Sequence, residues 1–587
     1  MKELLLGNKA VARGLYEAGC EFISSYPGTP STEITEEAAK YDEIYCEWAP
    51  NEKVAMEAAF GAALAGRRAF TGMKHVGLNV AADPLYTMSY TGVNAGLVVG
   101  VADDAGMHSS QNEQDSRHHA IAAKLPMLEP SDSAEARDFA MAAYELSERF
   151  DTPVLLKMCT RVAHSQSVVE SGERELHRKD YHKDIAKYVM MPGNAIRRHP
   201  IVEERTEKLR EYAEDCPFNR VEMGGTQNGI ITDSTSYQYV KEVFGDSVSV
   251  LKLGLINPLP IELIKDFAAK VEELFVVEEL DPIIENHVRS LGLETHGKDL
   301  LPVCGEFSQN LVAKALGGTP HEGASIADPI PPRPPVMCAG CPHRGLFYTL
   351  KKLGCTVLGD IGCYTLGAVA PLGAMEMTLC MGASVSAIHG FNKALGQESE
   401  NRTVAVIGDS TFMHSGMTGL ADIAYNQSNS TVIILDNSIT GMTGHQQNPT
   451  TGFNIKGDPA GKIDLEALCR AMGFERVRVI DPYNIKECED VISGELAASG
   501  PSVIISRRPC ALLKYVEHKP PLFVDPDKCR SCSSCMKIGC PAISMKQGEG
   551  EDKKKARVDA TLCVGCGVCK QLCPFDAFVE EKGGAQS

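Results

Sequence analysis

Short apolar runs alternate with helix-like stretches along most of the chain. Near the N-terminus the runs are GLVVGVADD and PVLLKM, and a helical stretch from Glu52 to Ala65 precedes them. The pattern returns in VSVLKLGLI and VEELFVVEEL, and again in TVAVIGDS and STVIILDN. Uninterrupted runs of this length are typical of strands buried on both faces of a parallel sheet. Their alternation with helices therefore indicates the α/β class.

A proline-rich segment, DPIPPRPP at residues 328–335, is the clearest domain boundary, because proline stiffens the chain and interrupts helices and central strands. Residues 166–222 are rich in charge and are interpreted as a linking or wrapping segment that contains helix. The rest is expected to form three α/β domains and a small cysteine-rich module, over residues 1–165, 223–320, 336–515 and 520–587.

Composition narrows the class of protein. A chain of 587 residues is too long for one core, so several domains are expected. The formal net charge of −19 disfavours binding to nucleic acid or to an anionic membrane surface. We expect no membrane span and no signal peptide, because no apolar run is long enough and the N-terminus lacks a cleavage pattern. Twenty-one cysteines then indicate metal ligation and free thiols, in the cytoplasm of an anaerobe.

Two cysteine runs close the chain and predict electron transfer. The second run follows C-x2-C-x2-C-x3-C-P, the spacing of bacterial two-cluster ferredoxins, in which the last cysteine of each run ligates the other cluster. Zinc knuckles are the alternative, but zinc needs no third cysteine at this spacing. The first run has four residues before its last cysteine, which leaves the nuclearity of its cluster open. The expected first set is Cys529, Cys532, Cys535 and Cys573, and the second set is Cys540, Cys563, Cys566 and Cys569.

Polar residues end two of the expected strands of the 336–515 domain. TVAVIGD ends in Gly408, Asp409 and Ser410, and TVIILDN ends in Asp436 and Asn437. Ligands gather at the carboxyl ends of parallel strands. A carboxylate and an amide at that edge predict a magnesium ion that bridges a diphosphate. Ordinary turns are the alternative explanation for both dipeptides.

The spacing resembles the GDG-x(24–27)-N motif of thiamine-diphosphate enzymes, with Ser410 in place of the second glycine. The stretch SITGMTGHQQNPT is similar to YGMTGGQ–PTT of the 2-oxoacid:ferredoxin oxidoreductase family, and YPGTPST from Tyr26 is similar to its YPITPST signature. The resemblance implies Asp409, Asn437 and the carbonyl of Ile439 as magnesium ligands. It also implies a cofactor contact from each of Gly408, Ser410, Gly441 and Met442.

The same resemblance assigns two residues near the N-terminus. Thr29 would face the substrate. Glu52 would face the aminopyrimidine of the cofactor, where a carboxylate promotes loss of the thiazolium proton. The alternative for Glu52 is an ordinary first-turn glutamate that is favoured by the helix dipole.

A third set of cysteines is also implied by the family. Its thiamine-binding subunits carry C-x-G-C, G-I-G-C and one late cysteine as ligands of a cluster beside the cofactor. The alternative is a redox-active C-x-x-C pair with two buried core thiols. The corresponding residues here are Cys338, Cys341, Cys363 and Cys510.

The phrases CAGCPHRG, GDIGCYTLG and HSSQNEQDSRH make the whole chain similar to the alpha subunits of the arylpyruvate branch of this family. The resemblance implies doubly wound thiamine-diphosphate domains, a transketolase-C-like domain and an α+β two-cluster ferredoxin-like module. It further implies a small beta subunit in an alpha2beta2 assembly, and conversion of arylpyruvates such as indolepyruvate, with coenzyme A, to aryl-acetyl-CoA and CO2 as electrons pass to ferredoxin.

Two other functions remain open from the sequence. One is oxidation of pyruvate or branched-chain oxoacids, and the other is electron transfer without catalysis. Residues that bind the substrate carboxylate are not readable from the pattern, and the candidates are Lys74, His75, Arg117, His118 and His119.

Overall fold

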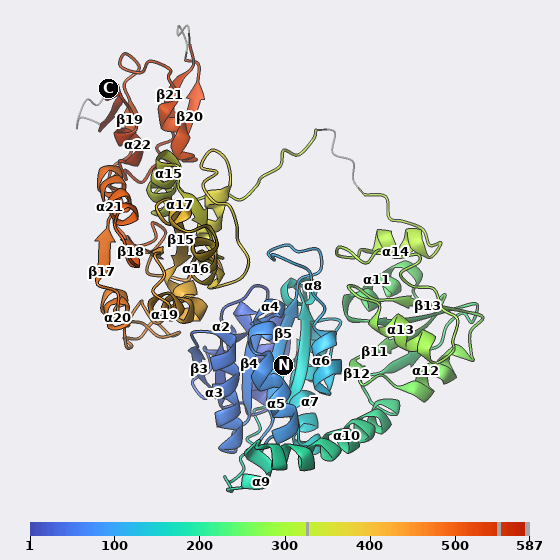
Figure 1. Ribbon diagram of the computed structural model, residues 1–587. Helices are drawn as coiled ribbons and strands as arrows, with labels where there is room; N and C mark the ends of the chain where they lie inside the picture. Colours follow the sequence, from blue (N-terminus) through green and yellow to red (C-terminus); the bar gives the residue numbers. More distant parts are fainter. Residues whose placement is uncertain (324–327, 549–552, 581–587) are drawn as a thin grey trace. The chain divides into compact units, whose positions relative to one another are not determined.

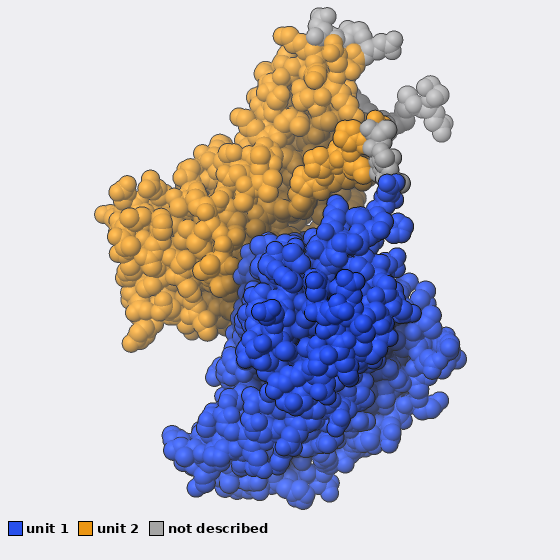
Figure 2. All heavy atoms as spheres, turned by 90° about the vertical axis from the view of Figure 1, so that its right-hand side faces the viewer, with its two compact units in different colours: residues 1–327 blue, residues 328–587 orange. Residues whose placement is uncertain are grey.

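The computed structural model describes residues 1–323, 328–548 and 553–580 and divides into two compact units (Figures 1 and 2). Unit 1 is residues 1–327 and unit 2 is residues 328–587. The described residues 328–335, the expected proline-rich boundary, form no helix or strand. Residues 549–552 and 581–587 of the expected C-terminal module lie outside the described part of the chain.

Unit 1 begins with a seven-stranded sheet in the order β12-β6-β7-β5-β4-β2-β3. All neighbours are parallel except β12 and β6. The strands are β2 (Phe22–Ser25), β3 (Tyr45–Trp48), β4 (Ala69–Lys74), β5 (Leu97–Asp103), β6 (Met127–Leu128), β7 (Val154–Cys159) and β12 (Leu255–Asn257). Its helices are α1 (Gly7–Glu17), α2 (Thr32–Ala38), α3 (Glu52–Leu64), α4 (His75–Val80), α5 (Ala82–Thr91), α6 (Arg117–Ala123), α7 (Ser133–Phe150) and α8 (Thr160–His164). Strands β4, β5 and β7 are wholly buried, which confirms the expected α/β pattern.

A charged segment then runs over the first domain. Strand β8 (Gln166–Glu170) pairs with β1 (Lys2–Leu6), and α9 (Ile185–Tyr188) and α10 (Pro192–Glu214) follow. Arg174 donates hydrogen bonds to the carbonyls of Tyr16 and Cys20, both at 2.8 Å. Arg205 of α10 donates to the carbonyl of Ser89 at 2.9 Å. The arginines of this segment therefore bind backbone carbonyls of the first domain, which fits a wrapping segment.

A four-stranded sheet in the order β13-β10-β11-β9 completes unit 1. Its elements are β9 (Arg220–Glu222), β10 (Asn228–Asp233), β11 (Ser249–Leu253) and β13 (Glu273–Val277), with α11 (Ser234–Phe244), α12 (Ile261–Ala268), α13 (Ile283–Ser290) and α14 (Gln309–Ala315). The single strand expected for VSVLKLGLI is wrong, because the chain breaks at Gly254 into β11 and β12, which belong to different sheets. The Asn219 side chain accepts hydrogen bonds from the N–H groups of Gly254 (2.9 Å) and Leu255 (3.1 Å), which turns the chain between the sheets.

Unit 2 is built on a five-stranded parallel sheet in the order β14-β15-β16-β18-β17, with apolar side chains packed on both faces. The strands are β14 (Thr356–Leu358), β15 (Thr403–Gly408), β16 (Thr431–Asp436), β17 (Arg476–Ile480) and β18 (Ser502–Arg507). The helices are α15 (His343–Leu353), α16 (Ala383–Leu395), α17 (Gln397–Glu400), α18 (Asp409–Thr411), α19 (Met417–Tyr425), α20 (Leu465–Ala471) and α21 (Ile485–Ala497). The doubly wound domain expected here is confirmed.

The C-terminal module consists of two short antiparallel pairs, β19 (Leu522–Val524) with β22 (Phe578–Glu580) and β20 (Ile543–Lys546) with β21 (Lys555–Val558). The module also has a 3-10 helix (Ser534–Ile538), which contains Cys535, and α22 (Val568–Gln571), which contains Cys569. The module shares an apolar cluster with Tyr348 and Ile485 of the preceding domain, and α15 contacts its 3-10 helix. Figure 1 shows α15 beside the strands of the module. In the part of the chain that the structure describes, no helix has the length and apolarity needed to cross a membrane.

Candidate functional site

Three of the residues expected at the cofactor or substrate lie at one edge of the seven-stranded sheet. Thr29 follows β2, Glu52 opens α3 directly after β3, and Lys74 is the last residue of β4. Because β2, β3 and β4 are parallel, their carboxyl ends meet at the same edge. This is where open α/β sheets bind ligands.

Glu52 is buried, with 5% of its surface exposed, although it lies in the first turn of a helix. Asn51 caps that helix by accepting a hydrogen bond from the N–H of Val54 at 2.9 Å, which fixes the first turn. The Glu52 carboxylate packs against α4 at Gly77, where an added Cβ would lie 2.6 Å from Oε1. A glutamate that only balances the helix dipole would stay in water, so this burial supports a functional role.

Gly77 therefore sets the position of the Glu52 carboxylate, and Gly77→Ala is expected to displace it. The added methyl group would lie at less than contact distance from Oε1, Cγ and Cδ of Glu52. Activity should fall at least about tenfold, since small misplacements of a catalytic group cost up to about a hundredfold. The measurement is kcat of the assembled enzyme with its partner subunit.

Gly61→Ala is the matched control, because Gly61 lies on the same helix as Glu52 and a Cβ there meets nothing within 4 Å. It should keep full activity. Equal losses in the two variants would mean that Gly77 does not act through Glu52.

Lys74 and His75 lie under the loop that carries HSSQNEQDSRH. Lys74 Nζ donates to the carbonyl of Ser109 at 2.8 Å, and burial lowers the pKa of Lys74. His75 Nε2 is 3.4 Å from Oδ1 of Asn112. The buried Nδ1 of His75 has no hydrogen-bond partner among the residues that the structure describes. Both side chains remain candidates for contacts to substrate.

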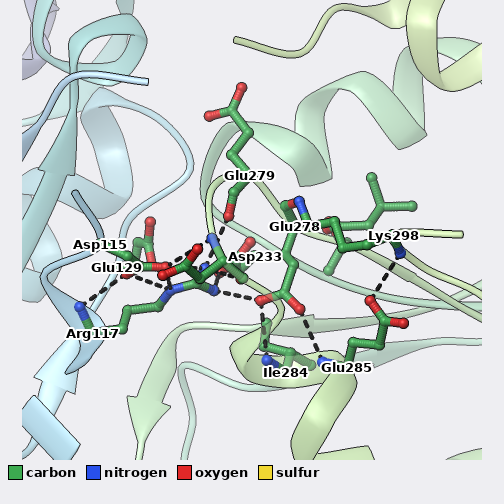
Figure 3. Close-up of polar contacts among 12 residues, drawn as sticks. Asp115, Arg117, Glu129, Asp233, Glu278, Glu279, Ile284, Glu285 and Lys298 are labelled. Atoms are coloured by element: carbon green, nitrogen blue, oxygen red, sulfur yellow. Dashed lines mark hydrogen bonds and ion pairs between the residues drawn. The ribbon is translucent and has the colours of Figure 1, made fainter. Parts of the chain in front are cut away.

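Arg117 is not available to a substrate carboxylate, which corrects that candidate (Figure 3). Its guanidinium is 1% exposed and forms ion pairs with Asp115 (2.6 Å), Glu278 (2.6 Å) and Asp233 (3.2 Å). Glu278 accepts two further hydrogen bonds, from the N–H groups that open α13. The guanidinium thus joins the first domain to the four-stranded sheet.

The two histidines after Arg117 have protein partners. His118 Nε2 pairs with Oδ2 of Asp281 at 2.7 Å, and His119 Nε2 is 3.1 Å from Oδ1 of Asn79. Burial lowers the pKa of His119, so its neutral form is favoured. Neither histidine presents a cation that is free for a substrate.

In unit 2, oxygen atoms converge at the carboxyl ends of β15 and β16, where the magnesium site was expected. The side-chain oxygen of Asn437 lies 3.2 Å from Oδ1 of Asp409 and 2.8 Å from the carbonyl oxygen of Ile439. In the rotated orientation the amide nitrogen of Asn437 donates hydrogen bonds to both of these oxygens, and in the other its oxygen would face a cation held between them. Octahedral Mg²⁺ with ligands at about 2.1 Å places neighbouring oxygens about 3 Å apart. These residues therefore fit a magnesium ion.

The electrostatics of Asp409 also fit a cation. Asp409 is 2% exposed, and burial together with the charge of Asp436 raises its pKa to about 7. Its Oδ2 accepts from Thr450 Oγ1 at 3.2 Å and from Asn448 Nδ2 at 3.4 Å. Oδ1 is left facing Asn437. Sequence reasoning missed Asn448 and Thr450, whose only signal is the NPT at the end of the SITGMTGHQQNPT stretch.

The remaining residues expected at the cofactor surround this point. Ser410 Oγ accepts from Thr440 Oγ1 at 2.9 Å. A Cβ on Gly408 would lie 2.7 Å from the Tyr364 ring, so glycine is required there. Met442 is 55% exposed and is open to a ligand.

The third cysteine set adjoins the expected magnesium site. The N–H of Cys510 donates to the carbonyl of Asn437 at 2.9 Å, and a Cβ on Gly441 would lie 3.4 Å from Cys363 Sγ. Burial raises the pKa of Cys341 to about 12, with further contributions from Cys338 and Cys363. Burial likewise raises the pKa of Cys363 to about 11, with smaller contributions from Cys510 and Cys338. The structure thus brings together four thiols from three distant segments.

The module cysteines line two separate cavities, and the grouping follows the crossed pairing expected from the two runs. One cavity is lined by the whole first set, Cys529, Cys532, Cys535 and Cys573. The other is lined by the whole second set, Cys540, Cys563, Cys566 and Cys569, together with Cys341 of the third set. In the described residues, no three His, Cys, Asp or Glu side chains are placed to hold a single metal ion. Thiols around a cavity fit a cubane cluster better than one zinc ion.

Comparison with protein families identifies three domain types. Residues 13–215 match the family "Pyruvate flavodoxin/ferredoxin oxidoreductase, thiamine diP-bdg". Residues 360–506, which include Asp409 and Asn437, match "Thiamine pyrophosphate enzyme, C-terminal TPP binding domain". Residues 556–579 match "4Fe-4S binding domain". The expectation of a thiamine-diphosphate oxidoreductase with an iron–sulfur module is confirmed.

Full-length relatives agree with these matches. The protein named indolepyruvate oxidoreductase subunit IorA from Archaeoglobus fulgidus is 42% identical, over 99% of this chain and 98% of its own. The protein of the same name from Pyrococcus horikoshii is 42% identical, over 99% of this chain and 97% of its own. The one from Methanothermobacter thermautotrophicus is 39% identical over 99% and 98%.

Proposed function

The chain belongs to the indolepyruvate oxidoreductase subunit IorA family, and we propose that it oxidatively decarboxylates arylpyruvates, indolepyruvate among them, to aryl-acetyl-CoA and CO2. As a subunit of an oxidoreductase, it would act with a small beta subunit in an alpha2beta2 assembly, take coenzyme A as co-substrate and deliver electrons to ferredoxin. One observation carries the proposal: the oxygens of Asp409, Asn437 and Ile439 converge beside the cysteines of the third set.

Each part of the chain has a defined task in this reaction. When bound, thiamine diphosphate supplies the carbanion chemistry that releases CO2 from a 2-oxoacid. Asp409, Asn437 and the Ile439 carbonyl would hold the magnesium ion of its diphosphate. The buried carboxylate of Glu52 would exchange a proton with the aminopyrimidine, and Thr29 would contact the substrate.

The three cysteine sets provide the exit for electrons. Oxidation of the decarboxylated substrate to the acyl-CoA product would release two electrons, whereas iron–sulfur clusters accept one at a time. The third set adjoins the magnesium site, and its Cys341 lines the cavity of the second set. The first set lines the next cavity in the module. This order leads from the cofactor to an external ferredoxin.

The substrate is tested by comparing indolepyruvate with pyruvate, 2-oxoglutarate and 2-oxoisovalerate in the presence of the partner subunit. We expect the highest kcat/KM for indolepyruvate. A higher value for pyruvate or 2-oxoisovalerate would overturn the aryl preference. Titration of the chain with thiamine diphosphate and Mg²⁺ tests the rival function of electron transfer without catalysis, because a chain of that kind would bind no cofactor.

Iron content tests the number of clusters. Protein purified anaerobically should contain roughly twelve irons per chain if all three sets hold cubane clusters. Cys510→Ser should lose part of this iron and the catalytic reduction of ferredoxin. Cys380→Ser is the control, since Cys380 is an exposed thiol of the same domain that belongs to no set. Roughly eight irons in fully active protein would show that the third set is structural.

A further inference from the structure

Arg344, on α15, joins the loop of the third cysteine set to the loop of the second. It is 4% exposed and its guanidinium donates to four backbone carbonyls. Two belong to the segment that carries Cys338 and Cys341: the carbonyls of Met337 and Cys338, the latter at 3.1 Å. Two lie just before Cys540: the carbonyls of Ile538 at 3.1 Å and Gly539 at 2.5 Å.

The charge of this guanidinium has no carboxylate partner among the described residues. Burial lowers the pKa of Arg344, and the charges of nearby thiols oppose this effect. These thiols come from both sets: Cys341 and Cys338 from the third, and Cys540 and Cys566 from the second. Arginine nevertheless stays protonated in proteins. A buried cation without a counter-charge is costly, and carbonyl dipoles compensate it only in part.

The cysteine sets can supply the missing negative charge when they hold their clusters, because the coordinating thiols are then deprotonated. Arg344 lines the cavity of the second set together with Cys341, Cys540 and Cys566. It does not line the cavity of the first set. Its positive charge therefore lies between the clusters of the second and third sets and outside the cavity of the first set.

We propose that Arg344 is a positioning residue for electron transfer, which ties the ligand loops of the second and third sets together and stabilises the reduced forms of their clusters. This inference rests on the proposed function. A positive charge near a cluster favours the form that carries one more electron. In each transfer one electron leaves the cluster of the third set and reduces that of the second. No bond or proton changes place.

The unusual spacing of the first cysteine run fits this role. Four residues separate Cys535 from Cys540, where bacterial ferredoxins have three. The interval ends in Gly539, which has a φ of 66° and caps the 3-10 helix. A side chain there would be strained and would lie 2.9 Å from Cδ of Pro371. The longer loop thus presents the carbonyls of Ile538 and Gly539 to Arg344.

Reduction potentials of the assembled, iron-loaded enzyme test the proposal. In an anaerobic redox titration followed by electron paramagnetic resonance, Arg344→Met should shift the midpoint of the second cluster to more negative potential. We expect at least a tenfold change in the reduction equilibrium, which is about 59 mV for one electron. The midpoint of the first cluster should stay in place. Arg344→Lys keeps the charge, so its second midpoint should stay close to that of the parent.

Arg530→Met is the matched control, because Arg530 lines the cavity of the first set but is exposed to water, which screens its charge. Arg530→Met should shift the midpoint of the first cluster much less than Arg344→Met shifts that of the second. The electrostatic role is overturned if Arg344→Met leaves the second midpoint unchanged, or if the Met and Lys variants shift it equally. An iron count of roughly eight would remove the third cluster from the proposed function, but the second midpoint would still test Arg344.

The tie between the loops has a readout that needs no iron. Hydrogen exchange of the iron-free full-length chain should show faster exchange at residues 338–341 and 538–540 in Arg344→Met than in the parent. Exchange in β15 and β16 should not change. Equal protection of both loops in parent and variant would overturn the positioning role.

Discussion

Asp409→Ala is expected to abolish magnesium-dependent binding of thiamine diphosphate. Oδ1 of Asp409 is one of the three oxygens that converge at the ends of β15 and β16, and it carries the only negative charge among them. Mutation of a residue that only hydrogen-bonds to a metal ligand weakens metal binding about 10- to 100-fold. Removal of a charged ligand itself should therefore weaken binding by more than about 100-fold. Calorimetric titration with thiamine diphosphate at saturating Mg²⁺ measures the effect.

The same variant should fold normally. The pKa of Asp409 is raised above its unfolded value of 3.8, to about 7, chiefly by burial. This carboxyl contributes stability that is fully present below pH 3.8 and is lost as the pH rises through about 7. At pH 8 the cofactor-free variant should therefore unfold at a temperature no lower than the parent.

The iron content of the C-terminal module shows whether Asp409→Ala disturbs only the cofactor site or the whole of unit 2. Asp409→Ala should keep the iron of the first and second sets, since those cysteines line cavities that Asp409 does not. Asp458→Ala, which removes an exposed aspartate of the same domain, is the control and should bind cofactor normally. Normal cofactor affinity in Asp409→Ala would sink the magnesium assignment.

Features encoded by short sequence patterns could be predicted. The strands around Asp409 and Asn437 appear as uninterrupted apolar runs, and parallel pairing brings the ends of adjacent strands together. The crossed pairing of the cysteine runs follows from ferredoxin spacing, and the two cavities have the expected lining. In each case the predictive signal lies within a few residues of the site.

Features that depend on distant contacts could not be predicted. Arg117 looked like a substrate ligand because it stands among polar residues, yet Asp233 and Glu278, more than a hundred positions away, neutralise it. VSVLKLGLI looked like one strand because Asn219, which divides it, lies outside the run. The role of Arg344 could not be predicted, because Ile538, one of its partners, lies 194 residues away in another loop.

Glu52→Gln is expected to retain cofactor binding and lose most of the activity. The amide has nearly the shape of the carboxylate, so the packing against Gly77 should survive. An amide cannot exchange a proton with the aminopyrimidine, and removing proton transfer of this kind costs roughly 10²-fold or more. Calorimetry with thiamine diphosphate and kcat of the assembled enzyme with indolepyruvate measure the two effects separately.

Glu57→Gln supplies the matched control for this prediction. Glu57 lies on the same helix, is exposed and forms an ion pair with Lys53 one turn away, so its loss should leave both affinity and kcat unchanged. A fall in cofactor affinity that accounts for the lost activity of Glu52→Gln would make Glu52 a binding residue. If Glu52→Gln works within a few-fold of the parent, its carboxylate serves the fold of α3 and α4, and the proton must be exchanged by another group.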